Sequence, residues 1–585
     1  MISDNAKRVL EARYLRRDSD GRIAESPDQL FERVARGVSE AELINGTTSD
    51  AVYWEDRFHR MLTALDFLPN SPTLMNAGTP LSQLSACFVL PIEDSMESIF
   101  GTLRDAALIQ RTGGGTGFSF SHLRPAGDPI ASTGGTSSGP VSFMKIYDCA
   151  TENIKLGGRR RGANMGVLRV DHPDIEEFIE AKRDGVSLRN FNISVGATDE
   201  FLSAVESGGD LVLRHPTDAR VVRSVPARRL FDDICDAAWA TGDPGLIFLD
   251  AIARTNPLPA CGAIEATNPC GEVPLLPYES CNLGSINLVH FVKERDRVVS
   301  VDFDRLRTQV EEGVRFLDDV ISVNRFPLGT VSQATLANRK IGLGVMGFAE
   351  LCILLGISYA SDQAILLADQ LMEFIARQAR LASARLADQR GVFPNWNASI
   401  YRASGLRLRN ATQTSIAPTG TISIIAGTSS SIEPLFALAY RRRHVLGEQT
   451  FAEINPLVLR HLTRLGQDSA KLMNSIASTG FLNLGGEMKN LFRTALEIPP
   501  EQHVRVQAAF QKHVDNAVSK TVNLPADASP QDVADAYLLS YRLGCKGVTV
   551  FRYGSKSEPM LELGLGETPE EREHFTKCDP EACRL

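Results

Sequence analysis

Residues 266–272 of this 585-residue chain read ATNPCGE and lie within a long alternating region. From residue 70 to about residue 350, short apolar or β-branched runs are separated by clusters of glycine, proline and serine, for example ACFVLPI (86–92), MGVLRV (165–170) and FNISVGA (191–197). Such a pattern is typical of strands that alternate with helices. The sequence therefore predicts an α/β sheet or barrel around this segment.

The ATNPCGE segment places a cysteine midway between an asparagine and a glutamate. Pro269 disfavours helical geometry for the residue before it and cannot lie inside a helix itself, so we expect an extended chain or a loop. In an extended chain Asn268, Cys270 and Glu272 would share one face at steps of about 6.5–7 Å, the width of a sugar ring. A thiol there could exchange hydrogen with a substrate, with Glu272 as base and Asn268 as a hydrogen-bonding anchor. A proline–glycine turn with an incidental cysteine is the alternative, and the segment alone leaves both open.

Helical patterns flank the alternating region. Residues 1–69 are predicted to form a short helical lead-in, because the apolar rhythm of AVYWEDRFHRMLTALDFL ends at Pro69. Residues 362–390 carry the clearest helical pattern, with Ser361 as the expected N-cap and Gly391 as the expected stop. We expect this helix to pack against the sheet through one apolar face, formed by Leu367, Leu371, Ile375, Ala379, Ala382 and Leu386.

The end of the chain differs in composition from the rest. Beyond residue 555 it becomes polar and acidic and ends GETPEEREHFTKCDPEACRL, so we expect a flexible tail over 556–585. No internal repeat and no long low-complexity linker divides the sequence before it. The sequence therefore predicts one large α/β catalytic domain over 70–555, between the lead-in and the tail.

Composition and charge exclude several classes of protein. With 43% hydrophobic and 23% charged residues, the chain has the usage of an ordinary globular protein. Its formal net charge of −9 argues against a broad grip on DNA or RNA, although local arginine clusters can hold small phosphates. The first residues lack the apolar core of a signal peptide, and no uncharged apolar run reaches about 18 residues, so we expect a cytoplasmic protein with no membrane partner.

The ten cysteines fall into different groups. In a reducing cytosol they are not expected to form structural disulfides. Four lie in apolar or helical-looking segments and are predicted to be buried hydrophobic residues: Cys149, Cys235, Cys352 and Cys545. Five others do not lie in such segments and are not explained by burial alone: Cys87, Cys270, Cys281, Cys578 and Cys583. The sequence does not decide to which group Cys261 belongs.

Cys87 and Cys281 lie where short strand-like runs begin or end, far apart in the sequence. Zinc binding is the usual rival for such thiols, but no Cys-x-x-Cys pair occurs and the spacing of Cys261, Cys270 and Cys281 suits no zinc finger. We therefore predict no metal bound by protein side chains and favour a pair that cycles between dithiol and disulfide.

The tail carries a further pair, Cys578 and Cys583, in a charged segment that cannot bury it. Such an arm can carry reducing equivalents from a cytosolic reductase into a buried site. An adventitious pair and a weak metal clip are the alternatives.

Three further kinds of segment are open to a nucleotide-binding interpretation. TGGGTG (112–117) lacks the Lys-Ser/Thr of a P-loop and has Phe118 where a dinucleotide-binding fold needs glycine, so it predicts either a close approach of the backbone to a ligand or a tight turn. APTGTIS (417–423) can form an anion nest if a helix starts there, or a Ser/Thr turn. The arginine triplets at 159–161 and 441–443 are typical of solvated charge, although the glycines beside the first also allow a mobile anion-sensing loop.

Together these segments resemble the large catalytic chain of ribonucleotide reductases, most closely the adenosylcobalamin-dependent class II enzymes. The resemblance covers about residues 50–555 and the tail, and it rests on eight segments in the family's order: NSPTLMNAGTP (70–80), SACFVLPIEDS (85–95), TGGGTGFSFS (112–121), GGRRRGANMG (157–166), NPCGE (268–272), ESCNLGSINL (279–288), APTGTIS (417–423) and GCKGVTVFRYGS (544–555). It favours the functional interpretation of each segment over its local alternative. It implies a ten-stranded α/β barrel whose central finger loop carries NPCGE.

The resemblance also implies a function, the reduction of ribonucleoside diphosphates to deoxyribonucleotides for DNA synthesis. Cys270 would become a thiyl radical that removes the 3′ hydrogen of the ribose, with Glu272 as base on the 3′ hydroxyl and Asn268 holding it. Cys87 and Cys281 would supply protons and two electrons as the 2′ hydroxyl leaves, ending as a redox-active disulfide. The tail pair would reduce that disulfide and be recharged by thioredoxin or a similar protein. The implied substrate-binding residues are Ser71, Ala86, Cys87, Gly115, Asn268, Pro269, Cys270, Gly271, Glu272, Pro418, Thr419, Gly420, Thr421 and Ile422.

The family's specificity effectors are deoxynucleoside triphosphates or ATP bound at a dimer interface, so the resemblance implies a homodimer. The matching effector-site residues are Asp94, Ser95, Met96, Arg124, Lys145 and Arg160, with loops around 124–139 and 157–164. The short lead-in leads us to expect no overall on/off control by ATP against dATP.

The source of the radical separates class II from its relatives. In class I enzymes a separate subunit supplies it through two adjacent tyrosines, but the matching stretch here, KGVTVF (546–551), has no tyrosine pair. The predicted cofactor, adenosylcobalamin, rests on this difference and on the resemblance, since no Asp-x-His-x-x-Gly motif is present. A class I large subunit that needs a second chain is the main alternative. A glycyl-radical reductase is disfavoured because the Arg-Val-x-Gly-Tyr segment is missing, and a nucleotide-binding regulatory protein of the same fold would not need five redox thiols.

Overall fold

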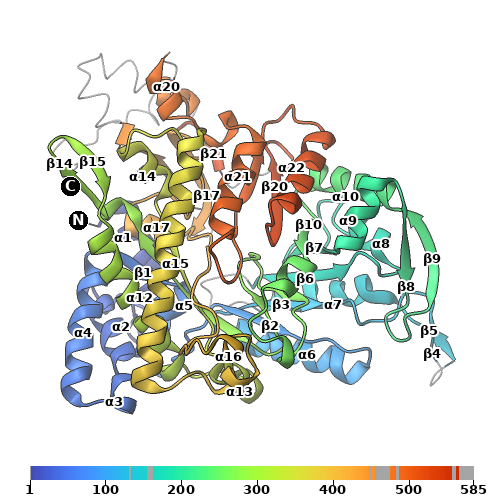
Figure 1. The fold of residues 1–585 in the computed structure, drawn as a ribbon, viewed down its shortest axis with the longest axis horizontal. Coiled ribbons are helices and arrows are strands. Elements are labelled where there is room, and N and C mark those ends of the chain that lie inside the picture. The colour runs from blue at the N-terminus through green and yellow to red at the C-terminus, as the bar shows by residue number, and fades with distance from the viewer. Residues whose placement is uncertain are drawn as a thin grey trace.

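The computed structural model describes residues 2–130, 134–154, 162–446, 449–455, 457–458, 475–482, 486–555 and 561–565 (Figure 1). Three residues with predicted roles lie outside these ranges, namely Arg160, Cys578 and Cys583.

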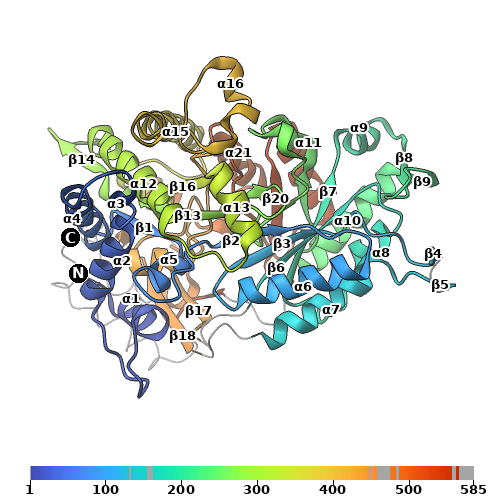
Figure 2. The same cartoon turned by 90° about the horizontal axis from the view of Figure 1, so that it is seen from below.

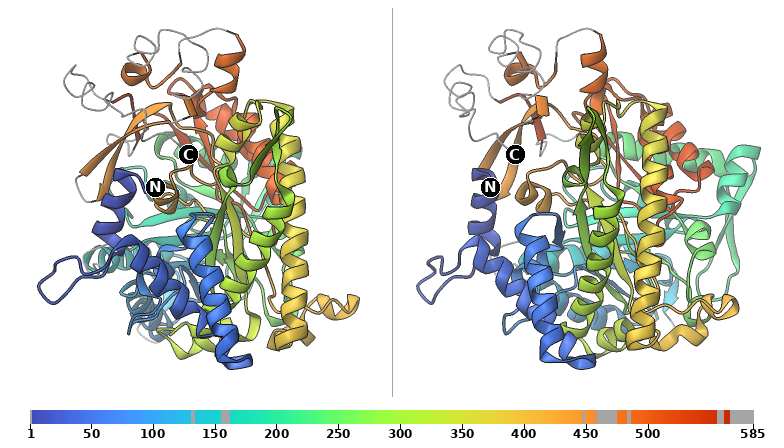
Figure 3. Two further views of the ribbon diagram at one scale, coloured as in Figure 1. Left: turned by 90° about the vertical axis from the view of Figure 1, so that its left-hand side faces the viewer. Right: turned by 60° about the vertical axis from the view of Figure 1, so that its left-hand side comes forward.

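The chain opens with helices, as predicted for residues 1–69. They are α1 (Asp4–Val9), the π-helical turn η1 (Leu10–Tyr14), α2 (Pro27–Ser39), α3 (Glu42–Asn45) and α4 (Thr48–Thr63). The start of α4 shows why the helices form where they do, because Thr47 and Asp50 make a capping box that gives its first N–H groups acceptors. α2 packs on α4 and on α12 (Phe303–Val323), so the lead-in lies beside the barrel (Figures 1 and 3).

A ten-stranded sheet forms the centre of the molecule. Its strands in spatial order are β1 (Phe67–Pro69), β13 (Ser280–Asn287), β2 (Cys87–Leu90), β3 (Gly115–Ser119), β6 (Asn164–Arg169), β7 (Phe191–Ala197), β10 (Gly245–Phe248), β20 (Gly547–Arg552) and β19 (Thr521–Leu524), with β16 (Ile341–Met346) paired along the other edge of β13. β2, β3, β6, β7 and β10 run parallel to one another. They meet the remaining strands in antiparallel pairs, β2 with β13 and β10 with β20.

Two isolated bridges close this sheet into a barrel. Leu343 of β16 pairs in parallel with Thr414, and Ile416 pairs in parallel with Val518, which lies just before β19. The segment around 414–416 therefore fills the gap between β16 and β19 and completes a ring. The predicted ten-stranded α/β barrel is confirmed.

Helices cover the outside of the barrel. They are α5 (Ser71–Asn76), α6 (Met96–Gln110), α7 (Gly139–Asn153), α8 (Ile175–Glu180), α9 (Asp199–Ser207), α10 (Ala227–Thr241), α11 (Leu249–Arg254), α13 (Gly329–Asn338), α14 (Phe348–Leu354), α15 (Asp362–Arg390), α16 (Tyr401–Ser404), α17 (Ile422–Ala426), α20 (Glu487–Leu491), α21 (Pro500–Gln511) and α22 (Pro530–Arg542). Smaller sheets pair β4 (Pro129–Ile130) with β5 (Gly135–Thr136), β8 (Asp210–Arg214) with β9 (Val221–Pro226), β14 (Val292–Arg295) with β15 (Val298–Val301), and β17 (Ala439–Leu446) with β18 (Gln449–Ile454) and β21 (Leu561–Leu563). Buried apolar side chains form one group under the lead-in, α12 and α15, a second under α6 to α10 and α22, and a third inside the barrel.

The long helix α15 matches its prediction at both ends. Ser361 caps it by accepting a hydrogen bond from the N–H of Ala364, and Gly391 ends it with a φ of 81°. Its partners differ from the prediction, because it packs mainly on α12 and α21 rather than directly on the sheet (Figure 3). The expected apolar face is buried except at Leu367, which is half-buried.

The cysteines predicted to be buried give a mixed result. Cys235, Cys352 and Cys545 are buried as expected, but Cys149 is exposed on α7, so that prediction is wrong. The prediction followed the apolar letters around Cys149, whereas its burial depends on which side of α7 faces the sheet. None of the helices in the described ranges is long and apolar enough to cross a membrane.

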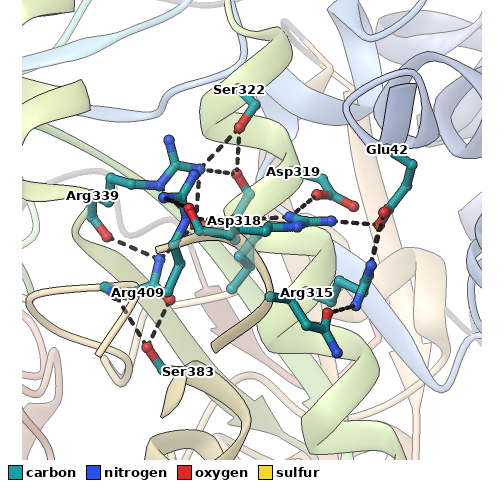
Figure 4. A network of polar contacts seen from close by, with 12 residues as sticks. Glu42, Arg315, Asp318, Asp319, Ser322, Arg339, Ser383 and Arg409 are labelled. Carbon is teal, nitrogen blue, oxygen red and sulfur yellow. Dashed lines mark hydrogen bonds and ion pairs between the residues drawn. The ribbon is translucent and has the colours of Figure 1, made fainter. Parts of the chain in front are cut away.

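A buried ionic network joins the lead-in to the barrel helices (Figure 4). Asp318 of α12 accepts hydrogen bonds from the side chains of Arg339, Arg390, Arg409 and Asn410. Burial opposes ionisation of this carboxyl group, but the neighbouring arginines hold the pKa of Asp318 down at about 2. The Arg390 guanidinium also pairs with Asp319 at 2.6 Å and with Glu42 of α3 at 2.7 Å.

Candidate active site

The finger loop is a tight turn at the tip of a short hairpin. β11 (Ala266–Thr267) pairs with β12 (Pro274–Leu275), and the N–H of Gly271 donates to the carbonyl oxygen of Asn268 at 3.1 Å. Gly271 has a φ of 84°, which favours glycine. The sequence allowed an extended chain or a loop over Asn268 to Glu272, and the structure has the loop in the form of this turn, because Pro269 suits the second position of a turn as well as it suits a strand.

Both halves of the barrel hold this turn from opposite sides. Asn192 of β7 donates from Nδ2 to the carbonyl oxygen of Pro269 at 2.7 Å. The carbonyl oxygen of Glu272 accepts from Ser415 Oγ and from the N–H of Ala517, each at 2.9 Å. The residue before Cys270 is thus tied to the first half of the barrel, and Glu272 is tied to the second.

The glycines of TGGGTG make room for the finger. A Cβ on Gly117 would lie 1.8 Å from the carbonyl oxygen of Thr267, and a Cβ on Gly115 would lie 2.9 Å from Pro269 Cγ. Only glycine at these two positions lets β3 approach the hairpin so closely. The sequence left open a close approach of the backbone to a ligand or a tight turn. At Gly115 and Gly117 the backbone does make a close approach, but to the chain's own finger rather than to a ligand.

A cavity of about 300 Å³ surrounds the tip of the finger. It is lined by almost all the predicted substrate-binding residues, namely Ser71, Ala86, Cys87, Gly115, Asn268, Pro269, Cys270, Glu272 and Pro418 to Ile422. Gly271 alone of the predicted set is not part of the lining. Asn268 and Glu272 are each 2% exposed, whereas the Cys270 side chain is exposed. The cavity is also lined by residues that the prediction missed: Asn70, Pro72, Gly113, Gly114, Ala163, Leu283, Gly284, Ser285 and Ala417.

Cys87 and Cys281 lie directly opposite each other on antiparallel strands. They are register partners of β2 and β13, and both belong to the apolar group inside the barrel. Directly opposite residues have Cβ atoms about 4.5–5.5 Å apart, which is close to what a disulfide needs. No disulfide joins them in the structure, and Asn268 Nδ2 donates to Cys87 Sγ at 3.2 Å. Burial strongly raises the pKa of the Cys281 thiol, so it is protonated at neutral pH.

The APTGTIS segment bends sharply beside the cavity. Thr419 has a φ of 54°, its Oγ1 accepts from the N–H of Ser431 at 2.7 Å, and α17 begins at Ile422. A helix does start within this segment, which favours the anion-nest interpretation over a simple Ser/Thr turn. On the other wall a hydrogen bond of 2.8 Å joins Ser71 Oγ to the hydroxyl of Tyr14 in η1, so the lead-in helps to place a residue of the cavity.

Four of the predicted effector-site residues lie together at the start of α6. Asp94 accepts from the N–H and from Nε of Arg124, and Ser95 caps α6, which begins at Met96. Lys145 lies exposed on α7, the helix that packs beside α6 (Figure 2).

A histidine links this region to the base of the finger. His122 contacts Glu265, the residue before β11, at 2.8 Å and Glu93 at 3.2 Å. These two carboxylates, Glu265 above all, raise the pKa of His122 to about 9, so it is charged at neutral pH. Among the described residues no group of three or more His, Cys, Asp or Glu side chains is arranged to hold a metal ion.

Comparison with known families identifies the architecture. The family description "Ribonucleotide reductase, barrel domain" matches residues 85–551, and "Ribonucleotide reductase, all-alpha domain" matches residues 1–82. The chain belongs to the ribonucleotide reductase family. The resemblance drawn from eight sequence segments is thereby confirmed.

Curated relatives of this ribonucleotide reductase family member align with nearly its whole length. A "Vitamin B12-dependent ribonucleoside-diphosphate reductase" of Thermoplasma acidophilum is 48% identical over 97% of this chain and 81% of its own. A protein of the same name from Mycobacterium tuberculosis is 53% identical over 96% of this chain and 80% of its own. A "Vitamin B12-dependent ribonucleotide reductase" of Streptomyces avermitilis is 32% identical over 97% of this chain and 67% of its own.

Proposed function

We propose that this chain reduces ribonucleoside diphosphates to deoxyribonucleotides, for DNA synthesis, by a thiyl-radical mechanism that depends on adenosylcobalamin. The observation that carries the proposal is the cavity in which Asn268, Cys270 and Glu272 meet, with Cys87 in its wall and Cys281 directly opposite Cys87 on the neighbouring strand. The printed names of the relatives support both the substrate class and the cofactor.

In the proposed reaction the finger residues act on the 3′ carbon of the ribose. Cys270 in its radical form removes the 3′ hydrogen and later returns it. The carboxylate of Glu272 accepts the proton of the 3′ hydroxyl, and the Asn268 side chain holds that hydroxyl in place. Burial of Asn268 and Glu272 beside an exposed Cys270 supports this division of roles.

Cys87 and Cys281 supply the reducing equivalents. The 2′ hydroxyl leaves as water after it takes a proton, two electrons pass from the thiols to the sugar, and the thiols become a disulfide. We further propose that Cys578 and Cys583 of the tail reduce this disulfide and are themselves reduced by thioredoxin or a similar dithiol protein. The direct opposition of Cys87 and Cys281 on neighbouring strands supports the step in which these two thiols become a disulfide.

The exposed thiol of Cys270 fits a cofactor that approaches from outside the chain. When bound, adenosylcobalamin supplies the one-electron chemistry that turns this thiol into a radical. β20, which contains the stretch where class I enzymes carry their tyrosine pair, has Val548 and Val550 buried and Thr549 exposed. A radical relay from a second subunit would need redox-active side chains in this strand.

We also propose a homodimer that binds nucleoside triphosphate effectors near α6. Met96 and Phe100 on α6 are 57% and 42% exposed, and Ile146 on α7 is 41% exposed. These apolar side chains on two neighbouring helices suit an interface with a second copy (Figure 2). The effector residues would be Asp94, Ser95, Met96, Arg124, Lys145 and Arg160 at its edge. The cytoplasmic location stays a prediction.

A turnover assay tests the proposal. The purified chain should reduce ribonucleoside diphosphates, supplied beside triphosphates, only when adenosylcobalamin and a dithiol are present. Replacement of Cys270 by serine should abolish turnover, a loss of at least about a thousandfold, since the radical then has no sulfur to form on. Nucleotide binding, measured by calorimetry, should stay unchanged. Turnover without cobalamin but with an added radical-generating subunit would contradict the proposal and favour a class I enzyme.

A further inference from the structure

A buried lysine lies in the same row as the two paired cysteines. Cys281 is opposite Cys87 on one edge of β13, and Asn282 is opposite Ile341 of the parallel strand β16 on the other edge. The residue before Ile341 is Lys340, so the register places it beside Cys281. Across the neighbouring strands β2, β13 and β16 the row therefore consists of the Cys87 thiol, the Cys281 thiol and the Lys340 ammonium group.

Lys340 faces the interior of the barrel. Ile341 belongs to the apolar group outside the barrel, whereas a Cβ on Gly342 would lie 2.4 Å from Leu283, which belongs to the group inside. Because successive side chains of a strand alternate, Lys340 points to the same side as Gly342 and Cys281. Lys340 is 2% exposed and Cys281 is fully buried.

The ammonium group of Lys340 has room for another acceptor. Its Nζ donates to Glu279 Oε2 at 2.6 Å, the one hydrogen bond it makes among the described residues. An ammonium has three N–H hydrogens, so two are left. The Glu279 carboxylate, in contrast, also accepts from the N–H of Leu276 at 2.7 Å and from Asn338 Nδ2 at 2.6 Å.

The charged groups that act on Cys281 are Lys340, Glu279 and Glu272. Lys340 favours a negative charge on the Cys281 sulfur, and the two glutamates oppose it. Burial opposes it most strongly, so among the charged groups that act on Cys281 in the described part of the chain Lys340 is the one that favours a thiolate. Cys87 lines the cavity and Cys281 does not, so an incoming reductant can reach the Cys87 sulfur first.

We propose that Lys340 stabilises the Cys281 sulfur as it leaves during reduction of the Cys87–Cys281 disulfide. The inference rests on the proposed function, which makes these thiols a redox pair. A thiolate of a dithiol reductant attacks Cys87 Sγ, the S–S bond breaks, and its electron pair stays on Cys281 Sγ beside the Lys340 ammonium. A proton then converts that sulfur to the thiol. The second thiolate of the reductant displaces Cys87, which takes a proton, and the reductant ends as a disulfide.

The test measures re-reduction directly, without cobalamin or nucleotide. The full chain is oxidised with diamide, and the reappearance of the Cys87 and Cys281 thiols under excess dithiothreitol is followed by alkylation and peptide mass spectrometry. An opposite charge within about 4–6 Å favours the ionised form of a titrating group by about 1–3 pKa units, and a better leaving thiol leaves faster, so Lys340→Gln should slow re-reduction about tenfold. Lys340→Arg should stay within about threefold of the unmodified chain, because it keeps the charge.

Glu279→Gln is the matched control, since it breaks the same buried ion pair but leaves the positive charge. It should re-reduce at least as fast as the unmodified chain. Equal slowing in Lys340→Gln and Glu279→Gln would mean that the pair is only structural, and an unchanged rate in Lys340→Gln would also overturn the proposal. If Lys340→Gln does not fold, the double variant Lys340→Gln/Glu279→Gln has no unpaired ion and should show the same slow re-reduction.

A single-turnover assay keeps the two proposals apart. The pre-reduced chain, given adenosylcobalamin and a ribonucleoside diphosphate, reports the proposed function and needs no re-reduction. If the unmodified chain forms no product in that assay although its disulfide is re-reduced at the normal rate, the proposed function is wrong. If the unmodified chain forms product but Lys340→Gln re-reduces the disulfide as fast as the unmodified chain, the proposed role of Lys340 is wrong.

Discussion

At the scale of single residues, His122 shows how a charged side chain can hold the start of the finger hairpin in place, through its contact with Glu265. It lies between Glu265, which begins the finger segment, and Glu93, which is next to a predicted effector residue. Arg169 also acts on Glu265, so the site contains two cations and two carboxylates.

The stability that His122 contributes should depend on pH in a defined window. Its pKa is raised from 6.5 to about 9 in the folded chain, so its stabilisation is complete below pH 6.5 and is lost as the pH rises through 9. His122 is 42% exposed, so we expect less than about 1 kcal/mol after solvent screening. Urea unfolding of the unmodified chain and of His122→Gln should show the larger difference at pH 6 and a smaller one at pH 10. A difference that does not change with pH would show that His122 carries no charge there.

At the scale of elements, the finger and β3 are built for close contact. Gly117→Ala would place a methyl group 1.8 Å from the carbonyl oxygen of Thr267, so either β3 or the hairpin has to move. We expect a loss of stability of at least about 1–3 kcal/mol, and a turnover that falls more than nucleotide binding does, because Cys270 shifts with the hairpin.

Gly329→Ala is the matched control for this substitution. It lies at the start of α13, and a Cβ there would meet no atom within 4 Å. Urea unfolding and turnover should change little in this variant. Similar losses in both variants would refute the close-contact argument.

The predictions that succeeded at this scale depend on local signals. Ser361 and Gly391 mark the ends of α15 because capping and left-handed geometry are properties of a few neighbouring residues. The fold and most of the cavity followed from eight recognisable segments. The shape of ATNPCGE did not, because a proline is compatible with both a strand and a turn, and the choice is made by the hydrogen bonds of Asn192, Ser415 and Ala517 from distant parts of the chain. The hydrogen bond between Tyr14 and Ser71 could not be predicted either, since no local sequence pattern connects these two residues.

At the scale of the whole molecule, the ionic network of Figure 4 joins the lead-in to α12 and α15. Asp318 and Asp319 are 0% exposed and Arg390 is 3% exposed. Burial, followed by the nearby charges of Glu42 and Asp318, raises the pKa of Asp319 well above its ordinary value. The positive charge of Arg390, which pairs with Asp319, opposes this rise in the pKa of Asp319.

Removal of Arg390 should destabilise the chain severely. Arg390→Ala removes the cation paired with Asp319 and one of those paired with Asp318 and Glu42, so we expect a loss of about 3–5 kcal/mol in guanidinium unfolding. Arg385 is the control, because it lies on the same helix and pairs with Glu311 at 2.7 Å, but both side chains are at least 40% exposed. Arg385→Ala should cost less than about 1 kcal/mol. Equal costs would mean that burial does not decide the strength of these pairs.

The place of the finger in the chain has a consequence for how the protein is made. The parallel strands β2, β3, β6, β7 and β10 all precede residue 266, and β13, β16, β19 and β20 all follow residue 275. During synthesis the first half of the barrel and then the finger leave the ribosome before the strands that close the ring. The second half can therefore assemble around a finger already laid against the first, so no finished loop has to be threaded into a closed barrel.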